Sequence, residues 1–531
     1  MKKFLSIALC AVMVLGILAG CGQKGNDTPK NDNNSTALSG SVSTNGSTSM
    51  DKVIGALKEQ FTADNPGVTV TYDPTGSGAG IEAVKNGSAD IGLASRALKD
   101  QEKSAGLKET TVALDGIAII VNADSKVADL TVAQIADIFT GVKTTDFDEA
   151  VKSGMIRMLG KDTDEAYLSE VIKVAVNPDC VKQVADDFKL VYTPFHGAGY
   201  RLVPEILRRL GYKHIICEPE QMKIDGDFPT VKNPNPEYKE GFTLAIELAK
   251  QNDVDLIIGT DPDADRTGIV LKDKSGEYVT LSGNQVGVLL TDYIITAKKL
   301  TNTMPAHPAV LKSIVTTEMA RAAAEKNGVA CFDTFTGFKF LAEKIKQFEK
   351  DGSHEYIFAF EESYGYLCGD YARDKDAVTA SMLIAEMAAY YRTQGKTLYD
   401  AMEEMYEKYG YYCEQTISIV MPGVSGLQRM KELMQELRDK PLTVVGPDKV
   451  DFTRDYMPGT RTCMADGRVE QMELKGQNVM YYELEGGTTF IIRPSGTEPK
   501  VKVYIMAKGA NKAEAEAKVD VLAAAAKEIV K

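Results

Sequence analysis

The sequence predicts an α/β protein of several domains, and three observations support this fold class. Its length of 531 residues exceeds that of an ordinary single domain. From residue 186 onward, short apolar runs rich in β-branched residues alternate with segments of helical periodicity. Loops rich in glycine, hydroxyl and acidic residues follow these runs, as expected where the strands of a doubly wound sheet end beside a ligand. After Thr416 the strands and helices follow a mixed order, which predicts a C-terminal α+β domain.

The composition argues against nucleic acid as a partner and favours a globular chain. The formal net charge is −14, and 44% of the residues are hydrophobic. The eight cysteines are scattered, without a CxxC pair or the spacing of metal ligands. We therefore expect buried free thiols, which are typical of a reducing compartment.

The first twenty residues predict an export signal, in conflict with those thiols. A basic start at Lys2 and Lys3 precedes a short apolar stretch over 4–18. The ending Leu18-Ala19-Gly20-Cys21 resembles the lipoprotein box of bacterial lipoproteins. This resemblance implies a cell-membrane lipoprotein that is anchored by a lipid on Cys21. Residues 21–37, rich in glycine, asparagine and lysine, predict a flexible tether.

Residues 38–142 predict a small α/β lobe with hydroxyl groups at its strand ends. Strands are expected before residue 47, at 68–72 and at 89–94, with a helix over 53–61. Hydroxyl and N–H groups at such positions suit an anion, although a Gly/Ser turn alone is more often only a turn. The polar residues at these ends are Ser47, Thr48, Ser77, Ser95 and Arg96.

In this order the segments resemble the phosphate-binding lipoproteins of ABC importers, which have a type II periplasmic-binding-protein fold. In that family two lobes close on phosphate, and the resemblance implies that the five polar residues contact inorganic phosphate. The resemblance ends near residue 142, so most of the second lobe is missing. Phosphate would stay open to water, where each contact contributes little. We expect this partial lobe to bind phosphate weakly.

Residues 146–300 predict a helical segment followed by an α/β unit. Residues 146–185 read as mainly helical, and the regular alternation begins at residue 186. The expected strands and helices are 189–193, 203–210, 213–217, 237–251 and 254–259. His196 lies in the loop after the first of these strands.

The apolar run 254–259 predicts a buried parallel strand, and three aspartates follow it. Carboxylates at i, i+2 and i+4 can converge on one Mg²⁺ ion and leave positions free for phosphate. An EF-hand loop is excluded, because Arg266 and Lys272 stand where glycine and glutamate are required. An acidic loop without metal remains the alternative. The candidate metal ligands are Asp261, Asp263 and Asp265.

Two further loops predict a site for a phosphorylated sugar. In residues 305–410, strands are expected at 310–317 and 356–360 and helices at 318–327 and 377–392. The carboxylates and the hydroxyl of Glu361-Glu362-Ser363, at the end of the strand 356–360, suit the binding of sugar hydroxyls. An ordinary capped turn is the alternative. In residues 411–531, the run from Arg493 to Lys500 forms a compact oxyanion cradle or, alternatively, a charged surface loop.

Together these loops resemble the α-D-phosphohexomutases, specifically bacterial phosphoglucomutase/phosphomannomutase, over about residues 146–531. The motifs are Thr193-Pro194-Phe195-His196-Gly197, the aspartate loop, Gly337-Phe338-Lys339, Glu361-Glu362-Ser363-Tyr364-Gly365 and Arg493-Pro494-Ser495-Gly496-Thr497-Glu498-Pro499. The resemblance implies a cytoplasmic, Mg²⁺-dependent enzyme acting on hexose phosphates. It implies tandem α/β/α domains 2 and 3 and an α+β domain 4, which span 186–300, 305–410 and 411–531.

The resemblance also assigns roles to individual residues, and it leaves two for His196: a place near the reacting phosphate, or ordering of its loop. The three aspartates hold Mg²⁺, Glu361 and Ser363 contact the sugar hydroxyls, and Arg373 and Lys375 are cations on the substrate side. The substrate-binding set that it implies is Gly337, Lys339, Glu361, Ser363, Arg373, Lys375, Arg493, Ser495, Gly496 and Thr497, of which the last four grip the non-reacting phosphate.

The sequence departs from the family pattern at the phosphoryl donor. Family members carry the transferred group on a serine in a Ser-His-Asn-Pro-like loop of their first domain. The only Ser-His pair here, Ser353-His354, is followed by glutamate and tyrosine. Because phosphoryl transfer needs a donor in line with the acceptor, we expect little or no mutase turnover. The alternatives are a phosphate-binding lipoprotein, or a chimera without either activity that joins two unrelated reading frames near 141–147 by gene fusion or assembly error.

Overall fold

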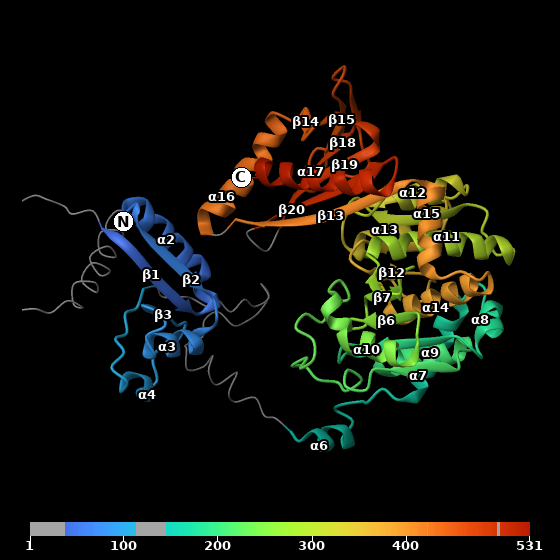
Figure 1. Ribbon diagram of the computed structural model, residues 1–531, viewed down its shortest axis with the longest axis horizontal. Coiled ribbons are helices and arrows are strands. Elements are labelled where there is room, and N and C mark those ends of the chain that lie inside the picture. Colours follow the sequence, from blue (N-terminus) through green and yellow to red (C-terminus); the bar gives the residue numbers. More distant parts are fainter. Residues whose placement is uncertain (1–37, 113–144, 422, 496–499, 531) are drawn as a thin grey trace, which may run out of the picture. The chain divides into compact units, whose positions relative to one another are not determined.

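The computed structural model describes residues 38–112, 145–421, 423–495 and 500–530 (Figure 1). The chain forms two compact units. The first comprises the chain up to Ile156 together with Val420–Leu433 and Ser495–Lys500. The second comprises Arg157–Ile419, Met434–Pro494 and the chain from Val501 onward.

The first unit contains a small parallel sheet of order β2-β1-β3, as the sequence predicts. Gly46, at the end of β1, has φ +146°, and a Cβ there would lie 2.1 Å from the Leu93 carbonyl oxygen, so the two strand ends meet only because this residue is glycine. The elements are β1 (Ser39–Gly46), η1 (Thr48–Met50), α2 (Asp51–Asp64), β2 (Gly67–Asp73), α3 (Ser77–Lys85), β3 (Ile91–Leu93), α4 (Asp100–Lys103) and α6 (Phe147–Lys152).

The second unit begins with helices and a five-stranded sheet of order β5-β4-β6-β7-β8. β6 runs parallel to β4 but antiparallel to β7, so the strand predicted as parallel has one antiparallel neighbour and the aspartates lie in a hairpin loop. The helix predicted from residue 237 starts only at Thr243, after a 3₁₀ turn. The elements are α7 (Lys161–Val171), η2 (Ile172–Val174), α8 (Asp179–Val184), β4 (Lys189–Thr193), α9 (Gly199–Leu210), β5 (His214–Cys217), η3 (Lys239–Phe242), α10 (Thr243–Asn252), β6 (Leu256–Thr260), β7 (Thr267–Lys272) and β8 (Tyr278–Thr280).

A four-stranded sheet of order β10-β9-β11-β12 follows. Its first strand ends at Ser313 rather than at Thr317, because the Thr317 hydroxyl accepts the N–H of Met319 and caps the next helix. The elements are α11 (Gly283–Leu300), β9 (Pro308–Ser313), α12 (Glu318–Lys326), β10 (Ala330–Thr334), α13 (Phe338–Asp351), β11 (Glu355–Glu361), β12 (Gly365–Leu367), α14 (Ala377–Thr393) and α15 (Leu398–Tyr409).

The C-terminal part is α+β, as predicted, with an eight-stranded sheet. β19 ends at Pro494 and pairs antiparallel with β20, which begins at Lys500; of the predicted phosphate cradle, residues 496–499 lie outside the described residues. The elements are β13 (Tyr411–Val420), α16 (Gly423–Asp439), β14 (Val444–Val445), β15 (Asp448–Asp455), β16 (Thr460–Cys463), β17 (Val469–Gln471), β18 (Met480–Leu484), η4 (Glu485–Gly487), β19 (Thr488–Pro494), β20 (Lys500–Gly509) and α17 (Lys512–Val530).

Helix α14 joins the five-stranded and four-stranded layers into one hydrophobic core. It is buried along almost its whole length and packs against α8 and α9 of the preceding layer (Figure 1). One cluster of buried side chains contains Leu190 of β4, Leu207 of α9, Phe358 of β11 and Leu383 of α14. The strand ends of the two layers are therefore held in a fixed relation.

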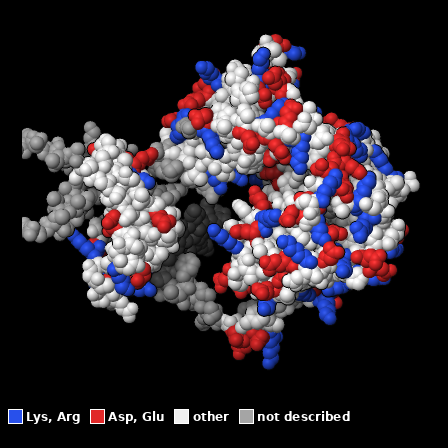
Figure 2. Space-filling view, in the orientation of Figure 1, with Lys and Arg blue, Asp and Glu red and all other residues white. Residues whose placement is uncertain are grey.

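The surface and the thiols agree with a globular chain. Lysine and arginine are interspersed with aspartate and glutamate on the face shown in Figure 2. The six cysteines within the described ranges are free, as predicted, but only Cys180 and Cys368 are fully buried. Among the described residues, no helix is long and apolar enough to cross a bilayer.

Candidate active site

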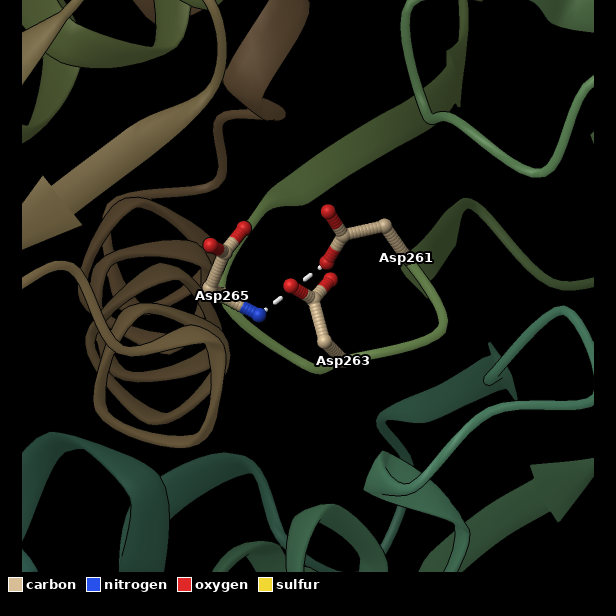
Figure 3. Close-up of side chains that lie close together, drawn as sticks. All are labelled: Asp261, Asp263 and Asp265. Carbon is tan, nitrogen blue, oxygen red and sulfur yellow. Dashed lines mark hydrogen bonds between the residues drawn. The ribbon is translucent and has the colours of Figure 1, made fainter. Parts of the chain in front are cut away.

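The aspartate loop closes tightly between β6 and β7. The Asp261 Oδ1 atom accepts the N–H groups of Asp265 and Arg266 at 3.0 and 2.8 Å, and Ala264 adopts a left-handed conformation with φ +57°. The ligand atoms of the three aspartates all lie within 4.8 Å of one another (Figure 3). The loop thus gathers the three predicted ligands at one point.

Charge and burial at this point favour a cation. Asp261 is only 4% exposed, and its burial raises its pKa to about 7, helped by the charges of Asp265 and Asp263. Lys375 lies 2.8 Å from Asp265 Oδ2, and Arg266 Nε lies 3.8 Å from Asp261. The two basic groups offset only part of the negative charge of three carboxylates.

The residues present fit Mg²⁺. Asp265 Oδ1 is buried without a hydrogen bond, although buried polar atoms are normally satisfied. Together with two further carboxylates, it forms the all-oxygen set that Mg²⁺ prefers. Asp261, Asp263 and Asp265 would hold the ion.

Glu361 marks the end of β11 beside this loop. It is 6% exposed, and its Oε1 atom accepts the N–H of Gly337 at 2.5 Å. Burial and, secondly, the charge of Glu362 raise the pKa of Glu361 to about 7. Gly337 has φ +117°, in the left-handed region that favours glycine. The backbone of the Gly337 loop is thereby fixed to the predicted sugar-binding carboxylate.

The aspartate loop and the Glu361 loop form one site. Arg266 pairs with Gly365 in an isolated β-bridge, and the Thr267 N–H donates to the Tyr364 carbonyl at 3.1 Å. Lys375 completes the connection, because it binds Asp265 and lies 5.5 Å from the centre of the Phe338 ring. The two loops come from different layers, so only the tertiary structure brings them together.

Arg493 reaches the same region from the C-terminal sheet. Burial raises the pKa of Tyr504 to about 12; the charges of Glu362 and Glu361 add to the rise, and the nearby Arg493 guanidinium opposes it. Tyr504 lies on β20, which pairs with the strand that carries Arg493, and it packs in one buried cluster with Ile314 and Val315, just after β9. Ser495 donates its N–H to the Lys500 carbonyl at 2.8 Å, and Gly496 and Thr497 lie outside the described residues.

Other predicted residues are placed less clearly in the site. Ser363 is partly buried in the turn after Glu361, and Lys339 is exposed in the first turn of α13, with its Nζ 4.9 Å from the Phe340 ring centre. Arg373 is exposed and forms an ion pair with Glu349 at the other end of α13. The structure thus brings Lys375, but not Arg373, to the aspartates.

His196 has contacts that order its loop. Its Nδ1 atom lies 2.8 Å from the Lys223 carbonyl, and its Nε2 atom lies 2.8 Å from the Thr230 hydroxyl. The side chain is 3% exposed. Of the two roles that the sequence leaves open, these contacts match loop ordering.

Sequence reasoning missed the hydroxyl pair beneath the site. Ser313 and Thr316 donate to Glu362 Oε2 at 3.2 and 3.1 Å, and burial raises the pKa of Glu362. Ser313 is the last residue of β9 and Thr316 follows it closely, so the same strand-end signal that marked Glu361 could have identified them.

The first unit brings together two of its five predicted phosphate contacts. The hydroxyl oxygens of Ser77 and Ser95 lie 3.1 Å apart, whereas Ser47, which is buried, bonds to Ser49. Arg96 binds both carboxylate oxygens of Glu102, which holds the pKa of that carboxyl at about 2. The Thr48 side chain and Cys21 lie outside the described residues.

The raised pKa of Glu361 predicts a specific pH dependence of stability. Its carboxyl is protonated in the folded chain between its ordinary pKa of 4.5 and about 7, so it contributes stability at low pH that is lost as the pH rises through this window. The unfolding temperature of the metal-free chain should therefore fall between pH 5 and pH 8, and it should fall less in Glu361→Gln than in the wild type. Thermal unfolding at both pH values measures this, and equal pH slopes would contradict it.

Three family models match the second unit. They describe phosphoglucomutase/phosphomannomutase alpha/beta/alpha domain II over residues 165–276, alpha/beta/alpha domain III over 282–409 and the C-terminal domain over 464–524. A model of a PBP superfamily domain matches residues 31–167.

Individual proteins show the same similarity. The phosphoglucomutase of Staphylococcus haemolyticus is 38% identical over 320 residues, covering 60% of this chain and 57% of that protein. The phosphoglucomutase of Staphylococcus saprophyticus is 34% identical over 366 residues, covering 68% and 64%. A crystal structure of the phosphoglucomutase pp63/parafusin from Paramecium, in an open form, matches 69% of this chain and 62% of its own at 18% identity, with a TM-score of 0.49. The chain thus spans less than two thirds of the length of these relatives.

Proposed function

The chain belongs to the phosphoglucomutase/phosphomannomutase family through domains II, III and IV, and on this premise we propose that it binds hexose phosphates together with Mg²⁺. The observation that carries the proposal is the joining of the aspartate loop to the Glu361 loop by the bridge between Arg266 and Gly365. A metal-binding group and a sugar-binding group thereby share one site.

The residues of the site divide the work of binding. Mg²⁺, when held by the three aspartates, supplies positive charge to phosphoryl oxygens. Glu361, fixed by the Gly337 N–H, accepts hydrogen bonds from sugar hydroxyls, and Ser363 adds a hydroxyl partner. Arg493 binds the non-reacting phosphate of the ligand through its charged guanidinium.

We also propose that mutase turnover is low. The sequence contains no Ser-His-Asn-Pro-like loop, and so no match to the serine that carries the transferred phosphoryl group in the family. Positioning a donor in line with the acceptor is the main catalytic task in phosphoryl transfer, and a site that binds without a donor gives little rate.

The proposal is tested with the full chain, Mg²⁺ and glucose 1-phosphate or mannose 1-phosphate. Calorimetry should detect binding, while an assay with added glucose 1,6-bisphosphate should show turnover near background. Turnover that disappears in Asp263→Ala would overturn the proposed impairment. Absence of binding to either sugar phosphate would overturn the proposed function and favour a chimera, which sequencing across the junction in the source DNA checks.

A second candidate function is phosphate binding by the first unit. The approach of Ser77 to Ser95 and the match to a PBP superfamily domain favour it. However, the Arg96 guanidinium is already paired with the Glu102 carboxylate. We expect Glu102→Gln to free the guanidinium. Phosphate binding should then tighten several-fold, because the phosphate gains one charge-assisted hydrogen-bonded contact with Arg96.

Calorimetry of the metal-free chain with inorganic phosphate checks this expectation. The matched control is Glu82→Gln, which breaks the exposed ion pair with Lys85 on α3 and leaves Arg96 bound to Glu102. The gain in Glu102→Gln should vanish when Arg96→Ala is added. A gain that survives this second change would contradict the role of Arg96.

Membrane attachment through Cys21 is a separate proposal. It is supported by the lipoprotein-box resemblance of residues 18–21. Incorporation of labelled fatty acid by the expressed chain, and its loss in Cys21→Ala, would test it.

A further inference from the structure

Two tyrosines hold the residue that begins helix α14. Asp376 Oδ1 accepts the N–H groups of Val378 and Thr379 at 2.8 and 3.3 Å and so caps the helix. Its other oxygen, Oδ2, accepts the hydroxyl of Tyr167 at 2.6 Å and also the hydroxyl of Tyr371. Tyr167 comes from α7, 209 residues away in the sequence.

The residues on either side of Asp376 contact the aspartate loop. The Lys375 Nζ atom lies 2.8 Å from Asp265 Oδ2. The Ala377 N–H donates to the Ala264 carbonyl at 3.0 Å. A displacement of Asp376 would therefore move both contacts to the loop that gathers the predicted metal ligands.

We propose that Tyr167 is a positioning residue of the metal site: through Asp376 it holds Lys375 and Ala377 against the aspartate loop. The inference rests on the proposed function, because it assumes that this loop binds Mg²⁺. The Tyr167 hydroxyl remains a donor, because burial and the charge of Asp376 raise its pKa far above the ordinary value. Residues that orient metal ligands from behind influence metal affinity in general.

The chain offers a matched control on the same helix. The hydroxyl of Tyr293 also donates to a carboxylate of α14, that of Glu386, and also at 2.6 Å. Glu386 lies deep in the core and bonds to the backbone N–H groups of Val176 and Asn177 instead of flanking the aspartate loop. Tyr167→Phe and Tyr293→Phe therefore remove similar hydrogen bonds at different distances from the proposed metal site.

The experiment compares Mg²⁺ affinity of the full chain by calorimetry. We expect Tyr167→Phe to weaken Mg²⁺ binding about fivefold, somewhat less than residues directly behind a ligand. Tyr293→Phe should bind Mg²⁺ like the wild type, although both variants lose thermal stability. In the metal-free chain, the N–H groups of Asp265 and Arg266, which donate to Asp261, should exchange faster in Tyr167→Phe alone.

The outcomes separate this inference from the proposed function. A wild type that does not bind Mg²⁺ would overturn both. A wild type that binds, together with unchanged binding and exchange in Tyr167→Phe or an equal loss in Tyr293→Phe, would overturn the role of Tyr167 alone. If Tyr167→Phe does not fold, Tyr371→Phe removes the other tyrosine hydroxyl on Asp376 and must show the same weakened binding.

Discussion

Replacing Asp263 by alanine is expected to weaken Mg²⁺ binding at least about hundredfold, because one of three ligating carboxylates is lost where even changes behind the ligands cost 10-fold or more. Without metal, the variant should be at least as stable as the wild type, since removal of one like charge relieves repulsion within the loop. The increase in unfolding temperature that Mg²⁺ gives the wild type should disappear. Calorimetry and thermal unfolding with and without Mg²⁺ measure the two effects.

Asp255→Ala is the control for this prediction. Asp255 directly precedes β6, the strand that leads into the aspartate loop, and so lies at the opposite end of that strand. Its carboxylate forms an ion pair with Lys272 at 3.2 Å. Its replacement should leave Mg²⁺ binding unchanged. An equal loss of Mg²⁺ affinity in both variants would mean that the ion binds through the overall negative charge of the chain. Undiminished Mg²⁺ binding in Asp263→Ala would show that Asp263 is not a ligand.

Replacing Lys312 by methionine is expected to lower the free energy of unfolding by about 3–5 kcal/mol, the usual cost of breaking a buried ion pair from one side. Lys312 is 0% exposed, and its Nζ atom lies 2.8 Å from Glu318 and 2.9 Å from Asp333. Burial alone would lower the pKa of Lys312, but the charges of Asp333 and Glu318 hold it above its ordinary value. Without the lysine, Arg321 alone would face both carboxylates. Urea unfolding measures the change.

The control for Lys312 is an exposed lysine of the same layer. Lys346 lies on the exposed face of α13, and Lys346→Met should change the free energy of unfolding by less than about 0.5 kcal/mol. A cost below about 1 kcal/mol for Lys312→Met would mean that the two carboxylates find other partners or become protonated.

Local patterns in the sequence predicted much of the fold. The β-branched runs before residues 194 and 261 predicted β4 and β6, and the period of the apolar residues predicted α9, α12 and α14. The antiparallel neighbour β7 was not predicted, because strand pairing depends on contacts that the pattern of one segment does not contain.

The candidate site also has one part that local sequence predicts and another that depends on tertiary contacts. The aspartate loop is made by neighbouring residues, and the three candidate ligands that it brings together could be named from their spacing alone. Lys375 and Arg373 read alike in the sequence, yet one binds Asp265 and the other Glu349. The two residues differ only in their ion-pair partners, which are distant in the sequence. The sequence pattern around each residue does not reveal those partners, because an ion pair forms wherever the fold brings opposite charges together.

The shared core around α14 has a consequence for dissecting this protein into fragments. The matches to domains II and III meet between residues 276 and 282, but buried side chains from both sides of this boundary belong to one cluster. A chain cut there would leave α14 without the α8 and α9 surfaces that cover it, and would expose apolar area to water. Residues 157–409 should accordingly unfold in one cooperative step, and neither half should be recovered as an independently folded fragment.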